Sequence, residues 1–221
     1  MSSILKVALL GSRNTTTTFL PSRDIPPLTD YIILITGAAG DLGRQTAIEL
    51  FRHGRPAHIY VADLPRDDNG ASALEAIRAQ VPDEIKDAVK LTYLGMDLAS
   101  FDSIRECVRL LKEREERLDV VICNAGIMPV STGLTREGYE VVFGVNYLGH
   151  ALLVRLLVGM MVQTVEEKKG GGRIVFVASE GHSMAPKGGV VFEKLRTECK
   201  DLVSCPWQGW EKEGLMKTGS L

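Results

Sequence analysis

Two patterns of apolar and polar residues alternate along most of this chain. From residue 31 onwards, short apolar runs rich in β-branched residues are separated by segments in which apolar residues have the helical spacing. The first pattern is typical of strands and the second of amphipathic helices. Strands are predicted at 32–36, 58–62, 89–94, 120–123 and 173–178, and helices at 44–52, 71–80, 101–117 and 137–162.

The order of these elements indicates an α/β fold. Strands that alternate with helices form βαβ units, whose strands run parallel in one sheet with helices on both faces. We therefore expect a doubly wound parallel sheet of the Rossmann type. The run at 173–178 is apolar after its first residue, which is the pattern of a strand buried on both faces.

Composition narrows the class of protein without naming a partner. The 221 residues are 45% hydrophobic and 24% charged, as in an ordinary globular domain. The 26 basic and 28 acidic residues leave a net charge of −2 without a long run of one sign, so no nucleic-acid partner is predicted. The four cysteines have no CxxC spacing and no nearby histidine pattern, so we expect reduced thiols and no metal site.

The start of the chain and its longest apolar window bear on location. Residues 1–28 are predicted to form a flexible leader, because the apolar run at 4–10 is interrupted by Lys6 and lacks the features of a secretory signal. A cytoplasmic location is expected, with a mitochondrial transit peptide as the alternative, since residues 1–23 hold three basic residues and no acid. The window 141–162 contains Asn146, His150 and Arg155, so no membrane span is predicted.

A glycine-rich turn follows the first predicted strand and leads into the first helix. Glycines let a ligand approach the backbone closely, and the N–H groups at the start of a helix attract an anion such as a pyrophosphate. We interpret this turn as a dinucleotide-binding site, and the alternative is a plain glycine-rich connection. The binding residues predicted in it are Thr36, Gly37, Gly40, Asp41, Leu42 and Gly43.

An acid at the end of the second strand strengthens that interpretation. Asp63 stands 20 residues after Gly43, where an acid in such a fold accepts hydrogen bonds from the adenosine ribose hydroxyls. A carboxylate there repels a 2′-phosphate, and Leu64 stands where an NADP-binding protein would offer an arginine, so NAD is favoured over NADP. Arg66 lies near enough in sequence to reach a phosphate. The alternative for Asp63 is a solvated residue that caps the next turn.

Three further segments follow the third, fourth and fifth strands: Asp97-Leu98, Asn124-Ala125-Gly126 and a strand end that closes on Ser179. With the glycine turn, in this order and spacing, they resemble the short-chain dehydrogenase/reductase family, especially its retinol dehydrogenase and WW-domain oxidoreductase branch. The resemblance covers residues 19–207, which are 189 of the 221. It implies strand order 3-2-1-4-5, an adenine contact at Asp97 and Leu98, and a cofactor-lining turn at Asn124, Ala125 and Gly126.

The glycine turn departs from the family's usual TGxxxGxG form. The second glycine of that form would fall at position 41, where this chain has Asp41, and Gly40 precedes it. The spacing Gly37, Gly40 and Gly43 instead resembles the TGxxGxxG form of the family's extended branch. We expect the turn still to bind a dinucleotide, though more weakly unless Asp41 points to solvent or caps the helix.

The resemblance also implies a reaction. Family members transfer hydride between nicotinamide and a carbinol or carbonyl carbon, with a tyrosine as acid or base and a lysine four residues later that lowers its pKa. A serine hydrogen-bonds the substrate oxygen, and an asparagine holds a water in the proton relay. Ser179 and Asn146 match these two residues; the alternatives are a strand-end serine and a helix-bend residue. A hydrophobic alcohol, aldehyde or ketone is the substrate class implied, with NAD or NADP as cofactor.

The tyrosine and lysine of the family are not in this sequence, because none of its five tyrosines is followed by lysine at the fourth position. We therefore expect an incomplete Rossmann-type domain at 29–207, truncated after the fifth strand, and an irregular tail at 208–221. Turnover should be very poor, and the fifth strand should lie at a sheet edge. The resemblance leaves an oligomer open, although the family's usual interface helix would lie in the missing part.

Two other classes of protein share some of these features. A non-catalytic dinucleotide-binding or interaction protein would keep the glycine turn and Asp63 without the catalytic pair. A methyltransferase would also have a glycine turn and an acid after its second strand, but the segments at Asn124-Ala125-Gly126 and Ser179 argue against it.

Overall fold

The computed structural model describes residues 19–128, 132–168, 171–179 and 189–198. Its centre is a parallel sheet of five strands in the order β3-β2-β1-β4-β5, as the sequence predicts. The described strands are β1 (Ile32–Thr36), β2 (His58–Asp63), β3 (Lys90–Gly95), β4 (Val120–Cys123) and β5 (Arg173–Phe176). The leader up to residue 18 and the tail at 208–221 lie outside the described residues.

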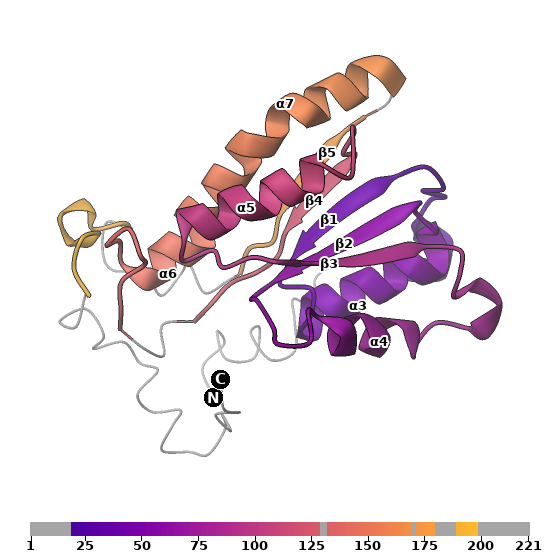
Figure 1. The fold of residues 1–221 in the computed structure, drawn as a ribbon, viewed down its shortest axis with the longest axis horizontal. Helices are drawn as coiled ribbons and strands as arrows, with labels where there is room; N and C mark the ends of the chain where they lie inside the picture. The colour runs from indigo at the N-terminus through magenta and orange to yellow at the C-terminus, as the bar shows by residue number, and fades with distance from the viewer. Residues whose placement is uncertain (1–18, 129–131, 169–170, 180–188, 199–221) are drawn as a thin grey trace.

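Helices cover both faces of the sheet, with α3 and α4 on one face and α5 and α7 on the other (Figure 1). The longer helices are α3 (Asp41–Glu49), α4 (Ala71–Arg78), α5 (Phe101–Lys112) and α7 (His150–Lys168). The shorter helical elements are α2 (Pro21–Asp24), η1 (Leu50–Gly54), η2 (Asp83–Ile85), α6 (Val141–Phe143), η3 (Gly144–Gly149) and η5 (Phe192–Lys194), of which η1 and η3 are π-helical.

Each face of the sheet has its own hydrophobic cluster, because successive strand residues point to opposite faces. On β1, Ile33 and Ile35 belong to the cluster under α3 and α4, whereas Ile32 and Leu34 belong to the cluster under α5 and α7. All four are at most 5% exposed. This two-sided burial holds β1 at the centre of the sheet and fixes the position of the turn that follows it.

Two helices begin at residues other than those that periodicity predicts. The helix after β1 begins at Asp41 and not at residue 44, with Gly40 as an N-cap that has no side chain to bond the first turn. The helix predicted at 137–162 begins at Val141, where the Glu140 carboxylate accepts hydrogen bonds from the amides of Val142 and Phe143 at 2.9 and 2.7 Å. It then passes through the π-helical η3 before α7, and α7 extends to Lys168.

The prediction that the fifth strand is buried on both faces is wrong. All four residues of β5 are exposed, and Phe176 is 60% exposed. The strand pairs with β4 alone and lies at the edge of the sheet, as expected for a sheet truncated after its fifth strand. An apolar run shows that a strand can be buried. Whether the strand is buried depends on the elements that pack against its faces and its free edge.

The stretch Val141–Lys168 is 28 residues long, and its most apolar window of 18 residues has a mean hydropathy of 1.7, so by length and composition one described helix could cross a membrane. Within the fold, its inward residues Leu153, Leu157 and Met161 pack in the cluster between the sheet and α5. One third of its most apolar window is buried. One face of the helix thus packs against the sheet, as in the flanking helices of an α/β domain.

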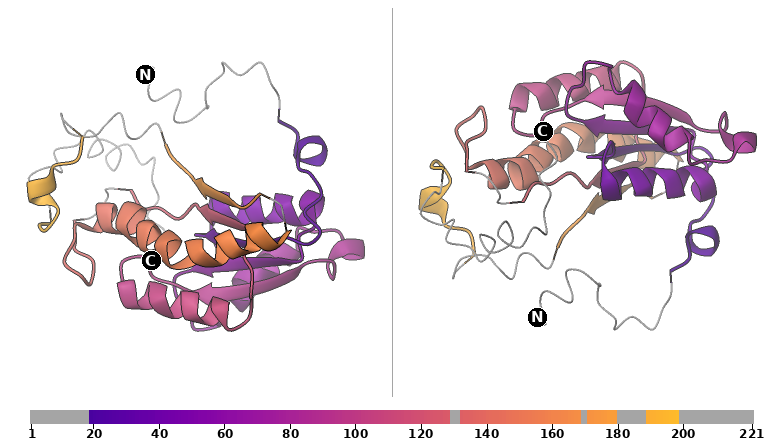
Figure 2. Two further views of the ribbon diagram at one scale, coloured as in Figure 1. Left: turned by 90° about the horizontal axis from the view of Figure 1, so that it is seen from above. Right: turned by 90° about the horizontal axis from the view of Figure 1, so that it is seen from below.

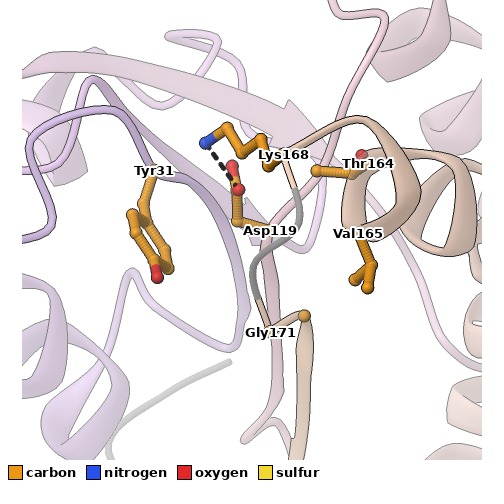
Figure 3. A pocket seen from close by; sticks show the side chains of 7 residues that line it. Tyr31, Asp119, Thr164, Val165, Lys168 and Gly171 are labelled. Atoms are coloured by element: carbon orange, nitrogen blue, oxygen red, sulfur yellow. Dashed lines mark hydrogen bonds and ion pairs between the residues drawn. The ribbon is translucent and has the colours of Figure 1, made fainter.

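A buried carboxylate joins three elements at the amino ends of the strands. Asp119 precedes β4, and its Oδ2 accepts from the Ile32 amide at 2.8 Å while its Oδ1 pairs with the Lys168 ammonium at 2.8 Å. Lys168 also donates to the Asp30 carbonyl at 3.1 Å. The pair lies beside a small hollow (Figure 3), which is lined by Tyr31, Asp119, Thr164, Val165, Lys168, Gly171 and Gly172.

The described ends of the chain lie at opposite ends of the molecule (Figure 2). At one end, α2 precedes Leu28, whose amide donates to the Gly54 carbonyl at 2.7 Å, so residues 19–28 of the predicted leader reach the body of the domain. At the other end, η5 leads to Arg196, whose guanidinium lies 3.6 Å from the centre of the Tyr139 ring.

Candidate functional site

The candidate residues from the sequence gather at one edge of the sheet, where all five parallel strands have their carboxyl ends. Thr36 ends β1 and Asp63 ends β2, while Asn124 directly follows β4. Asp97 and Ser179 lie two and three residues beyond the ends of β3 and β5. The carboxyl edge of such a sheet, where the strand order reverses beside β1, is where α/β proteins bind ligands.

The Thr36 side chain connects the end of β1 to the turn after β4. Its hydroxyl oxygen accepts hydrogen bonds from the amides of Asn124 and Ala125, both at 2.9 Å. In return, the Asn124 side-chain amide donates to the carbonyls of Thr36 and Gly37 at 2.9 and 3.3 Å. Thr36 is fully buried. The structure thus brings the first residue of the glycine turn together with the segment Asn124-Ala125-Gly126.

The three glycines of the turn meet different surroundings. Gly37 has a φ of +66°, and a Cβ on it would lie 2.8 Å from the Cα of Ala125. A Cβ on Gly43 would lie 2.3 Å from the Gly37 carbonyl oxygen and 2.5 Å from the Asn124 side-chain nitrogen. A Cβ on Gly40 would meet no atom within 4 Å among the described residues other than its two chain neighbours. Two glycines are therefore required by packing, whereas Gly40 borders open space at the start of α3.

Asp63 reaches across to the glycine turn. Its Oδ2 accepts a hydrogen bond from the Ala39 amide at 2.9 Å, and its Oδ1 accepts from the Leu64 amide at 2.8 Å. Each carboxylate oxygen can accept a second hydrogen bond. The side chain of Asp63 is therefore oriented by the turn beside it and does not cap the next turn, which Asp68 bonds through the amides of Gly70 and Ser72.

Asp41 and Leu42 begin α3 with exposed side chains. Leu42 is 61% exposed, and the N-cap of α3 is Gly40, without a side-chain hydrogen bond. Of the two arrangements that would spare dinucleotide binding, the structure shows Asp41 exposed to solvent.

The segment after β3 packs closely against the long helix. The Asp97 carboxylate accepts a hydrogen bond from the Ala99 amide at 2.8 Å. The backbone amide of Asp97 donates to the Ser103 hydroxyl at 2.9 Å. Leu98 is 5% exposed, and a Cβ on Gly149 would lie 2.6 Å from the Leu98 carbonyl oxygen. This close approach brings the helix that carries Asn146 to the carboxyl edge of the sheet.

Asn146 lies in the π-helical η3 and faces the turn after β4. Its Oδ1 accepts from the Ile127 amide at 2.8 Å, and its Nδ2 donates to the Ile127 carbonyl at 3.0 Å. Gly126 lies beside it, since a Cβ there would be in ordinary contact with the Asn146 oxygen at 3.4 Å. π-Helical turns occur often at functional sites. Ser179 is exposed, beyond the end of β5 at the same edge of the sheet.

The arrangement fits a dinucleotide. Open space at Gly40 lies where the amino end of α3 offers unpaired backbone N–H groups, which suit a pyrophosphate. The Asp63 carboxylate beside the turn suits the adenosine ribose hydroxyls. Among the described residues, no three His, Cys, Asp or Glu side chains form a group that could hold a metal ion. The two described cysteines, Cys107 and Cys123, are buried free thiols whose pKa burial raises to about 12.

Three contacts at the site escape sequence reasoning. The Ala39 amide orients Asp63, Ile127 holds the Asn146 side chain, and His150 lies between Thr36 and Asn146. Ala39 and Ile127 act through backbone groups, which a sequence does not distinguish. His150 carries one signal, since it follows Asn146 by four residues and, apart from Thr164, the other buried residues of α7 are apolar.

Comparison with known proteins agrees with this geometry. Residues 31–192 match the short chain dehydrogenase family. An uncharacterized oxidoreductase of Schizosaccharomyces pombe is 36% identical over 173 residues, which are 78% of this chain and 49% of that protein. Retinol dehydrogenase 14 of Mus musculus is 37% identical over 168 residues, 75% of this chain and 48% of that protein.

A solved structure shows the same fold. An NADH-dependent reductase in complex with NAD has a TM-score of 0.58 and 20% sequence identity, covering 89% of this chain and 76% of that one. The chain spans about half the length of the two curated relatives named above. The family match over residues 31–192, the strand order and the motifs at the sheet edge lead to one conclusion: the chain belongs to the short-chain dehydrogenase/reductase family.

Proposed function

We propose that this chain is the dinucleotide-binding part of an NAD-dependent oxidoreductase. The observation that carries the proposal is the Asp63 carboxylate, which lies within hydrogen-bond distance of the glycine turn and has an acceptor position left on each oxygen. When bound, nicotinamide supplies the hydride chemistry. The protein residues bind the dinucleotide, orient it, and position the groups that move a proton.

NAD is favoured over NADP by the charge at the end of β2. The Asp63 carboxylate would accept hydrogen bonds from ribose hydroxyls and repel a 2′-phosphate. Leu64 is 51% exposed beside it and offers no charge to a phosphate. Arg66 is exposed, three residues beyond Asp63, and supports the alternative of NADP binding.

A hydrophobic alcohol, aldehyde or ketone is the proposed substrate class. The support is the similarity to retinol dehydrogenase 14, whose name specifies a long apolar alcohol. In this role Ser179 would hydrogen-bond the substrate oxygen, and Asn146 would hold a water in the proton relay. Exposed apolar side chains of Ile127 and Met128 lie next to the turn that Asn146 contacts, and they would suit an apolar substrate.

A second function, dinucleotide binding without turnover, is favoured by one observation on this chain. The 221 residues contain no tyrosine followed four residues later by lysine. A positioned proton donor contributes about 10²- to 10⁴-fold to such rates. We therefore expect the 221-residue chain by itself to bind NAD with little or no turnover of substrates.

Calorimetric titration with NAD and NADP tests the proposal. The chain should bind NAD more tightly than NADP. Asp63→Ser should weaken NAD binding about 10- to 100-fold, because charge-assisted hydrogen bonds contribute about 1.5–3 kcal/mol. Leu64→Arg should strengthen NADP binding while it leaves the Asp63 carboxylate unchanged. Arg66→Ala is the matched control, because it removes the neighbouring arginine that could contact a phosphate.

Two results would overturn the proposal. Absence of heat with either dinucleotide at millimolar concentration would exclude dinucleotide binding. Tighter binding of NADP than of NAD by the unmodified chain would overturn the assignment of NAD. An assay of hydride transfer with a long-chain alcohol and aldehyde then separates the two functions, because turnover faster than about 1 s⁻¹ would exclude binding without catalysis.

A further inference from the structure

A buried histidine joins the two halves of the candidate site. His150 is the first residue of α7 and is 2% exposed. Its Nε2 lies 2.9 Å from the Thr36 hydroxyl oxygen, and its Nδ1 lies 3.1 Å from the Asn146 carbonyl oxygen. One ring nitrogen therefore contacts the glycine turn, and the other contacts the residue that matches the family's asparagine.

The partners of the ring determine which nitrogen carries the proton. A carbonyl oxygen can only accept, so Nδ1 must donate to Asn146. The Thr36 oxygen already accepts from two backbone amides of the turn after β4, which use both of its lone pairs. Its own proton then points to Nε2 at 2.9 Å and not to the Ile122 carbonyl at 3.5 Å. Both arguments give neutral His150 with its proton on Nδ1.

The helix is irregular where this contact is made. The His150 backbone amide donates to the Tyr147 carbonyl, three residues back, at the end of the π-helical η3. The Asn146 carbonyl, which a regular helix would pair with the amide of residue 150, accepts from the His150 side chain. The His150 side chain thus adds a hydrogen bond to the Asn146 carbonyl at the irregular turn.

We propose that neutral His150 is a positioning residue, which holds the Thr36 hydroxyl and the Asn146 carbonyl in one proton-ordered chain and so keeps the glycine turn ready for a dinucleotide. A protonated ring would direct a second N–H group at the Thr36 oxygen, whose lone pairs are both used. One of the two hydrogen bonds that backbone amides donate to the Thr36 hydroxyl oxygen would then be lost. The part of the proposal that concerns affinity rests on the proposed dinucleotide binding.

The surroundings of His150 favour the neutral ring. Burial lowers its pKa below the ordinary value, opposed in part by the bond to the Asn146 carbonyl. The titratable group on β4 is the Cys123 thiol, which is neutral because burial raises its pKa to about 12. After β3, the Asp97 carboxylate is bonded to a backbone amide of its own segment, and on α7 the Arg155 side chain is exposed. Acidification should therefore act on His150 directly.

Nuclear magnetic resonance of imidazole nitrogens tests the bridge without any ligand. At about pH 8, His150 should show a protonated Nδ1 and an unprotonated Nε2, and the signal should disappear in His150→Phe. The opposite tautomer, or a charged ring at that pH, would overturn the proposal. This measurement tests the hydrogen bonds of His150 to Thr36 and Asn146 even if the chain binds no dinucleotide. A failure of the proposed His150 contacts is therefore distinguishable from a failure of the proposed function.

Titration with NAD tests the positioning role. His150→Phe keeps an aromatic ring and removes both hydrogen bonds, and should weaken NAD binding about tenfold or more at about pH 8. His150→Gln should recover part of the affinity, because an amide has both a donor and an acceptor. Acidification below the lowered pKa of His150 should weaken binding by the unmodified chain more than by His150→Phe.

The matched control is His53→Phe, since His53 is a partly exposed histidine whose Nε2 lies 3.3 Å from the Glu49 carboxylate on the same helical segment. It should bind NAD as the unmodified chain does and show the same loss on acidification. Unchanged NAD affinity in a folded His150→Phe, or an equal loss on acidification in that variant, would overturn the positioning role. If His150→Phe does not fold, the NAD affinity of His150→Gln and the nitrogen signals of the unmodified chain test the positioning role.

Discussion

Two single-methyl substitutions in the glycine turn should separate packing from ligand binding. Gly43→Ala places a Cβ 2.3 Å from the Gly37 carbonyl oxygen and 2.5 Å from the Asn124 side-chain nitrogen, which itself bonds the carbonyls of Thr36 and Gly37. Gly40→Ala places a Cβ where no atom lies within 4 Å. The two variants therefore add the same group to the same turn in opposite surroundings.

The magnitudes follow from these contacts. Overpacking costs about 1–3 kcal/mol, and the loss of a hydrogen bond of Asn124 adds about 1 kcal/mol, so Gly43→Ala should lower the free energy of unfolding by about 2–4 kcal/mol. Gly40 has φ −120° and ψ 159°, which alanine adopts freely. A weaker N-cap, at about 1 kcal/mol, is offset by the reduced entropy of the unfolded chain, at about 0.4–1 kcal/mol. Gly40→Ala should therefore remain nearly as stable as the unmodified chain.

Urea unfolding followed by circular dichroism, combined with NAD calorimetry, checks both expectations. Gly40→Ala should keep its unfolding midpoint and lose NAD affinity about tenfold or more, because the added methyl group occupies the space open to a pyrophosphate. Normal NAD affinity in Gly40→Ala would refute the placement of the pyrophosphate beside Gly40. A Gly43→Ala variant within about 0.5 kcal/mol of the unmodified chain would refute the packing argument.

Two further predictions concern the stability of the fold. Asp119→Ala removes the acceptor of the Ile32 amide and the partner of Lys168, and should lower the free energy of unfolding by about 2–4 kcal/mol. Urea unfolding measures this loss, and a loss no greater than that of Lys168→Met would contradict the role of the buried carboxylate. Burial lowers the pKa of both His58 and His150, so the unfolded chain binds more protons than the folded chain at low pH. The free energy of unfolding should therefore fall as the pH drops below about 6.5, by at most about 1.4 kcal/mol per pH unit for each histidine. A free energy of unfolding that stays constant between about pH 7.5 and 5.5 would contradict this prediction.

The sequence predicts the sheet well because its signal is local. Apolar runs at β1 and β4 have the bounds that the structure shows, and the strand order agrees. Residues that follow these strands gather at one edge because parallel strands all end there, so Thr36, Asp63 and Asn124 could be placed together before any coordinates.

The rest depends on contacts between distant residues. Periodicity does not show that the Glu140 carboxylate starts a helix or that η3 is π-helical, because both depend on individual hydrogen bonds. The exposure of β5 depends on what lies beyond it and not on its own apolar residues. The role of His150 depends on its distance from Thr36, which is 114 residues away in sequence.

The position of β5 also sets an order of local opening within the sheet. Its four residues pair with β4 on one side only, and their side chains are exposed, so little burial opposes their release. β1, by contrast, is paired on both sides and buried on both faces. Amide hydrogens should therefore exchange with solvent fastest in β5 and slowest in β1. Because β5 leads to Ser179, the residue proposed to contact substrate lies on the part of the sheet that should open first, whereas the glycine turn extends from its most protected strand.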